Sequence, residues 1–267
     1  MSRFAAQLNT VRAYCTDQES LFQTLSKMKA IGYDGVELES VLLKGVDRQA
    51  LAEHLKELDL EVCSIRSPFA RTVYGLEDMM AEAKTLGCKL VGIGTVTASY
   101  FFGGLPGGPS SFTMANYMNQ ARITCETFRE NGLKPLYSLR DHEFIRLTDG
   151  RWIFQHILEG EETAEYLWEV DLLSLTRAGV TAAQVFEPLN GRMPVFRLED
   201  QKIRENEAYF FFTNREVCPL GEGLFDLPDW VQKAKKAGTE WFVLGQDLCD
   251  RDPFTCLELS LKTARKW

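Results

Sequence analysis

Three apolar segments in the second half of the chain carry the residues whose types bear most directly on chemistry. The segments are WEVDLLSLTRAG (168–179), PVFRLED (194–200) and WFVLGQD (241–247), and each reads as a strand. Asp171 in the first segment is a carboxylate, the kind of ligand that a hard divalent cation prefers. The second segment offers Arg197, which has a permanent charge and no lone pair, and the third offers Gly245, which has no side chain. The three segments therefore predict a charged site that lacks an ordinary set of metal ligands.

The elements that must position these residues alternate along the chain as in a parallel α/β fold. Strands are predicted at 4–8, 35–38, 61–65, 90–94, 135–139, 166–171, 195–198 and 241–244. Helices are predicted at 19–30, 48–58, 76–86, 114–131, 152–158, 182–189, 227–237 and 254–264. Eight such units in 267 residues predict a single-domain (β/α)8 TIM barrel, a fold that typically needs ~250 residues and keeps its site at the C-terminal ends of the strands.

Further segments, spread over nearly the whole chain, match a known pattern in their order and spacing. They are AAQLNTVR (5–12), KMKAIGYDGVELES (27–40), NGLKPLYSLRDHEF (131–144), LGEGLFD (220–226) and FVLGQDLCDRDPF (242–254). Together with the three strand segments they resemble the sugar phosphate isomerase/epimerase family, the xylose isomerase-like TIM barrels. The resemblance implies isomerisation or epimerisation of a small carbohydrate, in which a carboxylate removes a carbon-bound proton while a metal polarises the neighbouring oxygens.

Several site positions depart from the pattern of that family. Its metal-binding histidine and glutamate, in H-L-K-D and V-E-Q-D, correspond here to Arg197 and Gly245, and its fifth-strand histidines correspond to Ser138 and Arg140. Of the implied site, Glu37 and Asp171 keep suitable chemistry and are the predicted catalytic residues. The predicted substrate-binding residues are Arg66, Arg140, Arg197, Asp200 and Gln246. No metal cofactor is expected, and the metal-dependent activity is predicted to be lost or altered.

The three arginines at these strand ends have two compatible interpretations. They could form a lattice of ion pairs with Asp171 and Glu37, or they could leave surplus guanidinium that binds a phosphate, a sulfate or a sugar carboxylate. In the lattice, we expect the Arg197 guanidinium to lie within hydrogen-bond reach of Asp171. A Mg²⁺ or Mn²⁺ site made only of carboxylates remains an alternative. Its ligands would be Glu37, Glu39, Asp171 and Asp200.

Three functions stay open on these residues. The chain is predicted to act on or bind a small carbohydrate or sugar phosphate with an altered activity, to be a non-catalytic binding or partner subunit, or to be an active isomerase with the rearranged carboxylate site. The expected partner is a small carbohydrate or anionic sugar. Fold alone does not choose among these functions, because function depends on the site.

Composition limits the other classes of partner. The net charge of −8 argues against nucleic acid, which needs clustered lysine and arginine. No stretch approaches ~18 consecutive apolar residues, and MSRFAAQLNT lacks a signal pattern, so a cytoplasmic protein without a membrane contact is expected. The seven cysteines include no CxxC pair and are expected to be reduced thiols.

Two loops and the histidines complete these expectations. The Gly-rich segment 100–112 reads as a loop over the barrel mouth, and 205–223 reads as another loop. Its four consecutive aromatic residues, 209–212, should pack on the barrel, a ligand or another subunit, so a homo-oligomer is also considered. His54 and His156 fall in predicted helices of the outer ring, and His142 follows the fifth strand.

Overall fold

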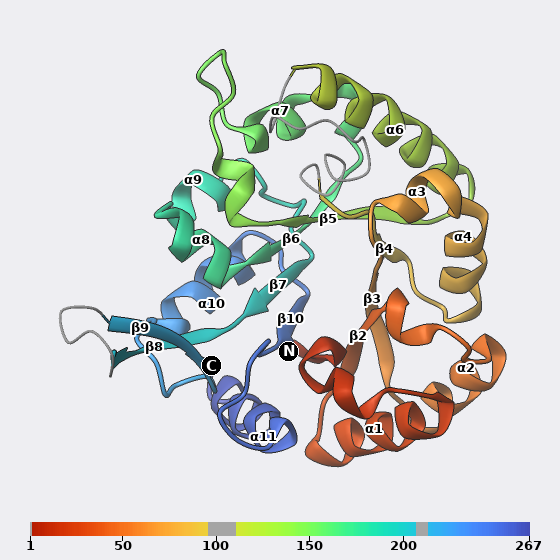
Figure 1. Cartoon of the computed structure of the whole chain (residues 1–267), viewed down its shortest axis with the longest axis vertical. Coiled ribbons are helices and arrows are strands. Elements are labelled where there is room, and N and C mark those ends of the chain that lie inside the picture. The colour runs from red at the N-terminus through yellow and green to blue at the C-terminus, as the bar shows by residue number, and fades with distance from the viewer. Residues whose placement is uncertain (1, 96–110, 207–212) are drawn as a thin grey trace.

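Parallel strands close into a barrel at the centre of the molecule (Figure 1). The computed structural model describes residues 2–95, 111–206 and 213–267. Within these ranges the eight barrel strands follow the order β1, β2, β3, β4, β5, β6, β7 and β10, and β10 pairs with β1. They are β1 Arg3–Gln7, β2 Gly35–Glu39, β3 Glu61–Arg66, β4 Leu90–Gly92, β5 Lys134–Leu139, β6 Leu167–Asp171, β7 Val195–Leu198 and β10 Trp241–Leu244. The predicted (β/α)8 barrel is confirmed.

Helices surround the barrel on its outside (Figure 1). The α-helices are α1 Gln18–Ile31, α2 Arg48–Glu57, α3 Ala70–Tyr74, α4 Leu76–Thr85, α6 Ser111–Glu130, α7 Ile153–Glu159, α8 Leu172–Ala178, α9 Ala182–Phe186, α10 Leu227–Lys236 and α11 Pro253–Ala264. Short 3₁₀ helices are η1 Leu8–Tyr14, η2 Ser40–Leu43, η3 Asp141–Phe144 and η4 Glu161–Thr163. In the described residues, no helix is long and apolar enough to cross a membrane.

The ends of α1 show why the sequence forms helices where it does. Asp17 precedes the helix, and its carboxylate accepts a hydrogen bond from the backbone N–H of Ser20 at 2.8 Å, which satisfies one of the free donors of the first turn. Gly32 ends the helix with a φ of 107°, a left-handed conformation that a side chain would disfavour. The helix predicted at 19–30 is therefore confirmed as α1, which returns the chain to the start of β2.

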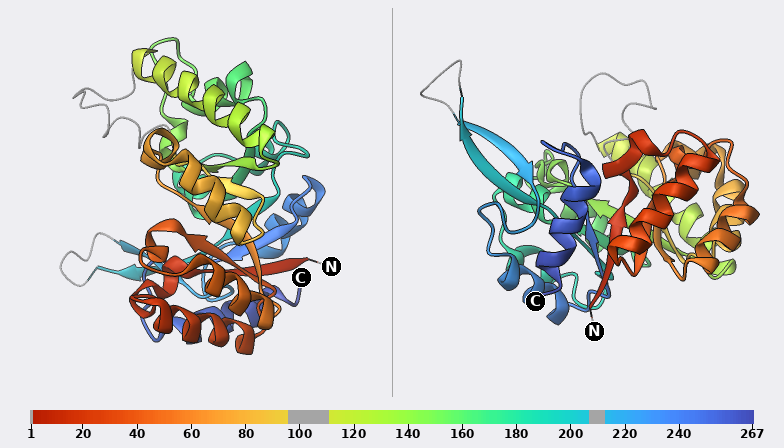
Figure 2. Two further views of the ribbon diagram at one scale, coloured as in Figure 1. Left: turned by 90° about the vertical axis from the view of Figure 1, so that its right-hand side faces the viewer. Right: turned by 90° about the horizontal axis from the view of Figure 1, so that it is seen from below.

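Two segments differ from the prediction. The strand predicted at 166–171 is β6, which ends at Asp171, but the apolar run that follows it is helix α8, which was not among the predicted helices. Part of the segment expected as a loop after β7 is an antiparallel hairpin, formed by β8 Asp200–Glu205 and β9 Thr213–Cys218. Figure 2 shows that this hairpin projects from the barrel on the side opposite to the two chain termini. The Gly-rich stretch and the four aromatic residues at 209–212 lie largely or wholly outside the described residues.

The inside of the barrel changes from apolar to polar toward the carboxyl ends of the strands. A small cluster fills its amino-terminal part and includes Ala5, Cys63, Leu136, Val195 and Val243, whereas the larger core lies between the strands and the helices. Side chains alternate along a strand, so the inward position that follows Ala5 on β1 is Gln7, and the inward position that follows Val195 on β7 is Arg197. Both are buried and polar. The fold therefore places its polar interior at the end where TIM barrels carry their sites.

Candidate active site at the carboxyl ends of the strands

Glu37 lies at the bottom of this polar interior with no exposed surface. Its carboxyl oxygens accept hydrogen bonds from Gln7 Nε2 at 3.1 Å and from Ser64 Oγ at 2.8 Å, on the two neighbouring strands. Burial and the nearby negative charge of Glu169 raise the pKa of Glu37 to about 8. The raised pKa favours the protonated form of this predicted catalytic residue more than an exposed glutamate would have it.

Glu169 is a site residue that the sequence analysis missed. It lies on β6, two residues before Asp171, and is buried, with Ser138 Oγ donating to its Oε2 at 2.5 Å. Arg66 Nε lies 3.9 Å from the same oxygen, and Arg66 Nη1 donates to Glu39 Oε1 at 2.9 Å. Side chains two residues apart on a strand point to the same face, so the position two residues before Asp171 could have identified Glu169.

Arg197 does not make the predicted hydrogen bond to Asp171. Its Nη1 lies 3.9 Å from Asp171 Oδ2, which is an ion-pair distance beyond hydrogen-bond reach. Instead Nη2 donates to Glu199 and, at 3.2 Å, to Asp247 Oδ1. The two strands do bring residues 171 and 197 into register. The guanidinium, however, reaches Glu199, which directly follows β7 and which the sequence analysis also missed.

Asp171 is held by a different arginine and by the helix that follows it. Arg140 Nη1 donates to its Oδ2, Leu173 N donates to its Oδ1 at 2.9 Å, and Ser174 Oγ donates to its Oδ2 at 3.2 Å. Burial alone would raise the pKa of Asp171, but the charges of Arg140 and Arg197 and the backbone donors lower it. Asp171 is thus a fixed carboxylate that caps α8 and neutralises Arg140.

Exposure divides the site into a buried floor and a rim that solvent reaches. The side chains of Glu37, Glu169, Arg197 and Glu199 are at most 2% exposed and form the floor. Those of Arg66, Arg140 and Asp247 are 22%, 16% and 55% exposed and belong to the rim. Burial raises the pKa of Glu199 to about 7, although Arg197 opposes the shift. A ligand that enters from solvent would meet the rim residues first.

Two predicted substrate-binding residues support loops instead of facing this centre. The buried carboxylate of Asp200 accepts hydrogen bonds from backbone N–H groups of the segment 221–225. Gln246 Nε2 donates to the carbonyl oxygens of Leu248 at 2.9 Å and Val217 at 3.3 Å. Of the seven predicted site residues, Glu37, Asp171, Arg66, Arg140 and Arg197 are therefore brought together, whereas these two are not.

The donor set does not fit a divalent metal at the position that the family resemblance implies. Arg197 fills the space between Asp171, Glu199 and Asp247 with a permanent positive charge. A Cβ built on Gly245 would lie 2.6 Å from Gln7 Oε1, so the glutamine side chain occupies the place of a ligand there. Among the described residues, no group of three or more His, Cys, Asp or Glu side chains is arranged to hold a metal ion.

The alternative metal site made only of carboxylates is not assembled either. Glu37 is bonded to Gln7 and Ser64, and Glu39 to Arg66. Asp171 and Asp200 are engaged as described above, by Arg140 and by a backbone loop. The four carboxylates of that alternative therefore do not converge on one point.

We expect Gly245→Ala to lower the free energy of unfolding by about 1–3 kcal/mol, because the new methyl group overlaps the buried Gln7 side chain. In the double variant with Gln7→Ala the two effects should not add, since the glutamine that causes the overlap is gone. Urea unfolding measures both. Gly75→Ala is the control, because a Cβ there meets nothing closer than 3.7 Å. Equal costs of Gly245→Ala with and without Gln7 would contradict this packing.

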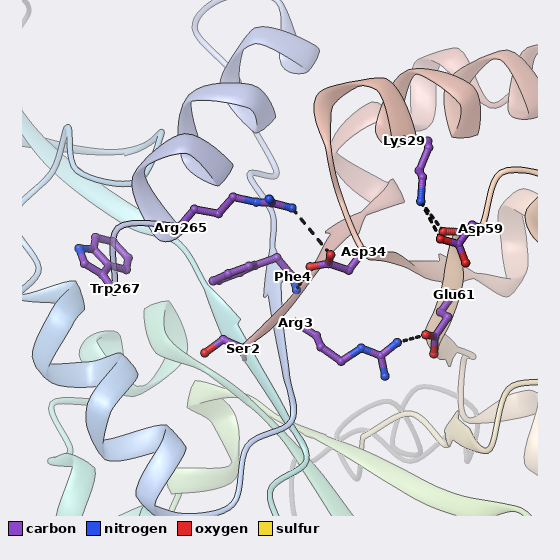
Figure 3. Close-up of a pocket in the computed structure, with 9 residues that line it drawn as sticks. All are labelled: Ser2, Arg3, Phe4, Lys29, Asp34, Asp59, Glu61, Arg265 and Trp267. Atoms are coloured by element: carbon purple, nitrogen blue, oxygen red, sulfur yellow. Dashed lines mark hydrogen bonds and ion pairs between the residues drawn. The ribbon is translucent and has the colours of Figure 1, made fainter.

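A hollow lies at the opposite, amino-terminal end of the barrel (Figure 3). It has a volume of about 500 Å³, and its charged side chains pair with one another across it. Lys29 Nζ lies 3.3 Å from Asp59 Oδ2, Arg265 Nη2 lies 3.7 Å from Asp34 Oδ1, and Arg3 pairs with Glu61. These pairs are largely exposed, and this end of a TIM barrel typically serves stability. The hollow is therefore separate from the candidate site.

Comparison with known proteins agrees with the fold. No family model matches the chain, and no curated protein matches it. Among solved structures, it is similar to the probable 3-DHS dehydratase AsbF of Bacillus anthracis, with a TM-score of 0.74, 14% identity and 99% of each chain covered. A sugar phosphate isomerase/epimerase from Parabacteroides distasonis gives 0.73 and 13%, covering 100% of this chain and 99% of that one. A xylose isomerase-like TIM barrel protein from Mycobacterium smegmatis, in complex with magnesium, gives 0.69 and 13%, covering 99% and 96%.

These likenesses define the class of fold. The chain has the fold of the sugar phosphate isomerase/epimerase and xylose isomerase-like TIM barrel proteins, which the sequence segments had implied. Because the identities are 13–14%, they carry no substrate or activity to this chain. Function has to be argued from the site.

Proposed function

We propose that this protein binds a small carbohydrate at the carboxyl ends of its barrel strands without a metal, and that the metal-dependent isomerisation implied by its resemblance is lost or altered. The observation that carries the proposal is the position of Arg197. Its buried guanidinium lies among Asp171, Glu199 and Asp247, where the resemblance places a metal-binding histidine. A guanidinium supplies positive charge to the carboxylates through hydrogen bonds, so the site is neutralised by the protein itself.

The rim provides the groups that would hold the ligand. Arg66 and Arg140 are partly exposed, and each guanidinium carries five N–H donors, of which the carboxylate partners Glu39 and Asp171 engage only some. The remaining donors suit hydroxyl, carboxylate or phosphate oxygens of a sugar. The exposed carboxylate of Asp247 is an acceptor for sugar hydroxyl groups. Carbohydrate binding therefore needs no group beyond those present at the rim.

Turnover places a stronger demand on the site than binding does. Isomerisation requires a base for a carbon-bound proton and a positive charge beside the oxygen that becomes negative. Glu37, whose pKa is raised, is the candidate for the base, but Arg197 is already paired with carboxylates and is at most a partial substitute for a metal. This favours weak or altered turnover. The same pairing of Arg197 equally supports a second candidate, a binding protein without catalysis.

The proposal predicts how ligands and metals affect thermal stability. After treatment with EDTA, addition of Mn²⁺, Mg²⁺ or Zn²⁺ should leave the melting temperature unchanged, and elemental analysis of untreated protein should find far less than one equivalent of metal. At least one of D-fructose, D-fructose 6-phosphate, D-gluconate and myo-inositol should raise the melting temperature, because a ligand that binds the folded state stabilises it. The increase should disappear in the double variant Arg66→Ala with Arg140→Ala.

Arg122→Ala provides the matched control, since Arg122 is an exposed arginine on α6 that also pairs with a glutamate. It should keep the ligand-induced increase. One equivalent of tightly bound metal would refute the metal-free site, and an increase that survives in the double variant would refute binding at the rim. Incubation of the stabilising sugar with the protein, followed by analysis for its epimers, separates turnover from binding alone.

A further inference from the structure

Carboxyl groups outnumber guanidinium groups at the candidate site. The guanidinium groups of its floor and rim belong to Arg66, Arg140 and Arg197. The carboxyl groups around them belong to Glu37, Glu39, Glu169, Asp171, Glu199 and Asp247. Burial raises the pKa of Glu37 to about 8 and that of Glu199 to about 7, but the other four carboxyl groups still exceed the three cations. The site therefore carries an excess of negative charge.

Charged groups at the edges of the site do not remove this excess. Arg12 adds one guanidinium, whose Nη1 donates to backbone carbonyl oxygens. Glu143 and Asp200 add two buried carboxyl groups, and His142 Nε2 lies 3.2 Å from Glu143 Oε1. The two internal segments outside the described ranges contain no lysine, arginine or histidine in the sequence. Their side chains therefore bring no positive charge to the site.

Glu169 is a buried carboxyl group that accepts no hydrogen bond from a cation in the described structure. Its Oε2 accepts from the neutral hydroxyl group of Ser138 at 2.5 Å, and Arg66 Nε lies 3.9 Å away, beyond hydrogen-bond reach. Its Oε1 is buried and has no hydrogen-bond partner among the described residues. A buried polar atom without a partner is costly, because its lost hydration is not replaced. Glu169 thus offers a free acceptor to a ligand.

Gln7 offers a second free acceptor in the floor. Its Nε2 donates to Glu37 Oε1 at 3.1 Å, whereas its Oε1 is buried and has no partner among the described residues. Arg197 Nε is a buried donor of the floor that also lacks a partner there. At the rim, the half-exposed carboxylate of Asp247 is a further acceptor. The floor therefore has more free acceptors than free donors, and a ligand that completes it has to supply N–H or O–H groups.

We infer that the ligand of this site carries a protonated amine, as an amino sugar does, and that its ammonium group pairs with Glu169. The inference rests on the proposed carbohydrate binding and names the class of carbohydrate. An ammonium group has three donors and no acceptor, and its hydrogen bond to a carboxylate is stronger than a bond between neutral groups. The spare donors of Arg66 and Arg140 and the carboxylate of Asp247 remain for the hydroxyl groups of the sugar.

The same excess of carboxyl groups disfavours an anionic ligand. A phosphate or carboxylate group would bring further negative charge close to Glu169, and like charges placed side by side oppose binding. The guanidinium groups do not compensate fully, since Arg197 pairs with Glu199 and Asp247, and Arg140 pairs with Asp171. Among carbohydrates of similar size, the site therefore favours a cationic sugar over a neutral one, and a neutral sugar over an anionic one.

Matched pairs of sugars test this inference by isothermal titration calorimetry on the full chain at pH 6.5. D-glucosamine, D-galactosamine and D-mannosamine carry an amine in place of one hydroxyl group of D-glucose, D-galactose and D-mannose. At least one amino sugar should bind about tenfold more tightly than its neutral counterpart, as expected for one charge-assisted hydrogen bond. Its N-acetyl derivative, which has no charge, should lose this advantage. Glucose 6-phosphate should bind no more tightly than glucose.

A substitution of Glu169 tests the position of the amine. Glu169→Gln keeps the shape of the side chain and removes its charge, so it should abolish the advantage of the amino sugar and leave the affinity for the neutral sugar unchanged. Glu126→Gln is the matched control and should keep the advantage, since Glu126 is an exposed glutamate on α6 that pairs with Arg122. Circular dichroism confirms that both variants are folded. If Glu169→Gln does not fold, the comparison of the amino sugar with its N-acetyl derivative on the wild type decides.

Three results would overturn the inference. They are equal affinities for amino and neutral sugars, an advantage of the amino sugar that survives in Glu169→Gln, and an equal enthalpy of binding for ammonium chloride alone, which would indicate a site for a small cation. In the first case the neutral sugars still bind, so the proposed carbohydrate binding stands without the amine. If no sugar binds, including those proposed above for the thermal-stability measurement, the proposed function fails together with the inference.

Discussion

Replacing Arg197 by methionine is expected to lower the free energy of unfolding by about 3–5 kcal/mol, because it leaves buried carboxylates without their cation. Arg197 is 2% exposed and pairs with Glu199, Asp247 and, at a longer distance, Asp171. Methionine keeps much of the volume of the side chain, so the loss would come mainly from charge. Urea unfolding followed by circular dichroism measures it. Arg122→Met removes an exposed pair and should cost at most about 0.5 kcal/mol.

A second substitution tests which carboxylate depends on Arg197. Because Arg197 donates to Glu199 but lies 3.9 Å from Asp171, adding Glu199→Gln to Arg197→Met should recover more stability than adding Asp171→Asn. Asp171 also keeps Arg140 as a partner. Equal and additive effects of all these changes would show that the residues do not interact, and the interpretation of Arg197 as a built-in cation would fail.

The stability cost of Arg197→Met should depend on pH in a defined direction. Burial raises the pKa of Glu199 to about 7 even though Arg197 opposes the shift, so removal of Arg197 raises it further. A carboxyl group whose folded pKa lies above its unfolded value binds more protons in the folded state, and stability then falls as pH rises. The cost of Arg197→Met should therefore be larger at pH 8 than at pH 6. A cost that is constant between these two pH values would contradict the role of Glu199.

The barrel was predictable from the sequence, because every barrel strand is a short apolar run and most helices begin or end at a recognisable cap. The hairpin β8–β9 was not, since its strands are mostly polar and only Ile203 is a large exposed apolar residue. The strand predicted at 166–171 is β6, but the short helix α8 that directly follows it was not among the predicted helices. The local hydrophobic pattern therefore does not predict the secondary structure of a segment that is stabilised by residues distant in sequence.

The charged site was predictable in its composition but not in its pairing. The sequence brings Asp171 and Arg197 to adjacent strand ends, and the structure confirms that register. Which oxygen a long guanidinium reaches depends on its side-chain torsions and on competing carboxylates, and Glu199 directly follows the strand that carries Arg197. Motif positions drew attention away from Glu169 and Glu199, although both occupy inward positions two residues from a predicted site residue. The alternation of side chains along a strand would have predicted both residues, whereas the family motifs predicted neither.

Asp200→Ala should reveal whether this predicted substrate-binding residue is structural. Its buried carboxylate accepts hydrogen bonds from the backbone N–H groups of Gln201 at 2.8 Å, Gly221 at 2.9 Å, Gly223 at 3.0 Å and Phe225 at 3.3 Å. Each buried donor left without a partner costs about 1–3 kcal/mol, and partial relaxation of the loop reduces the total, so we expect a loss of about 3 kcal/mol.

Hydrogen exchange should locate the loss of Asp200 in the segment 219–226, which those bonds hold, and urea unfolding should give its size. Asp226→Ala is the control. Asp226 is exposed and its carboxylate caps α10 through one bond to Asp229 N, so its removal should cost about 1 kcal/mol. A direct contact with substrate would instead make Asp200→Ala weaken ligand binding at nearly unchanged stability. That outcome would return Asp200 to the site and would require the loop to open when ligand binds, since in the present structure every described bond of this carboxylate goes to the backbone.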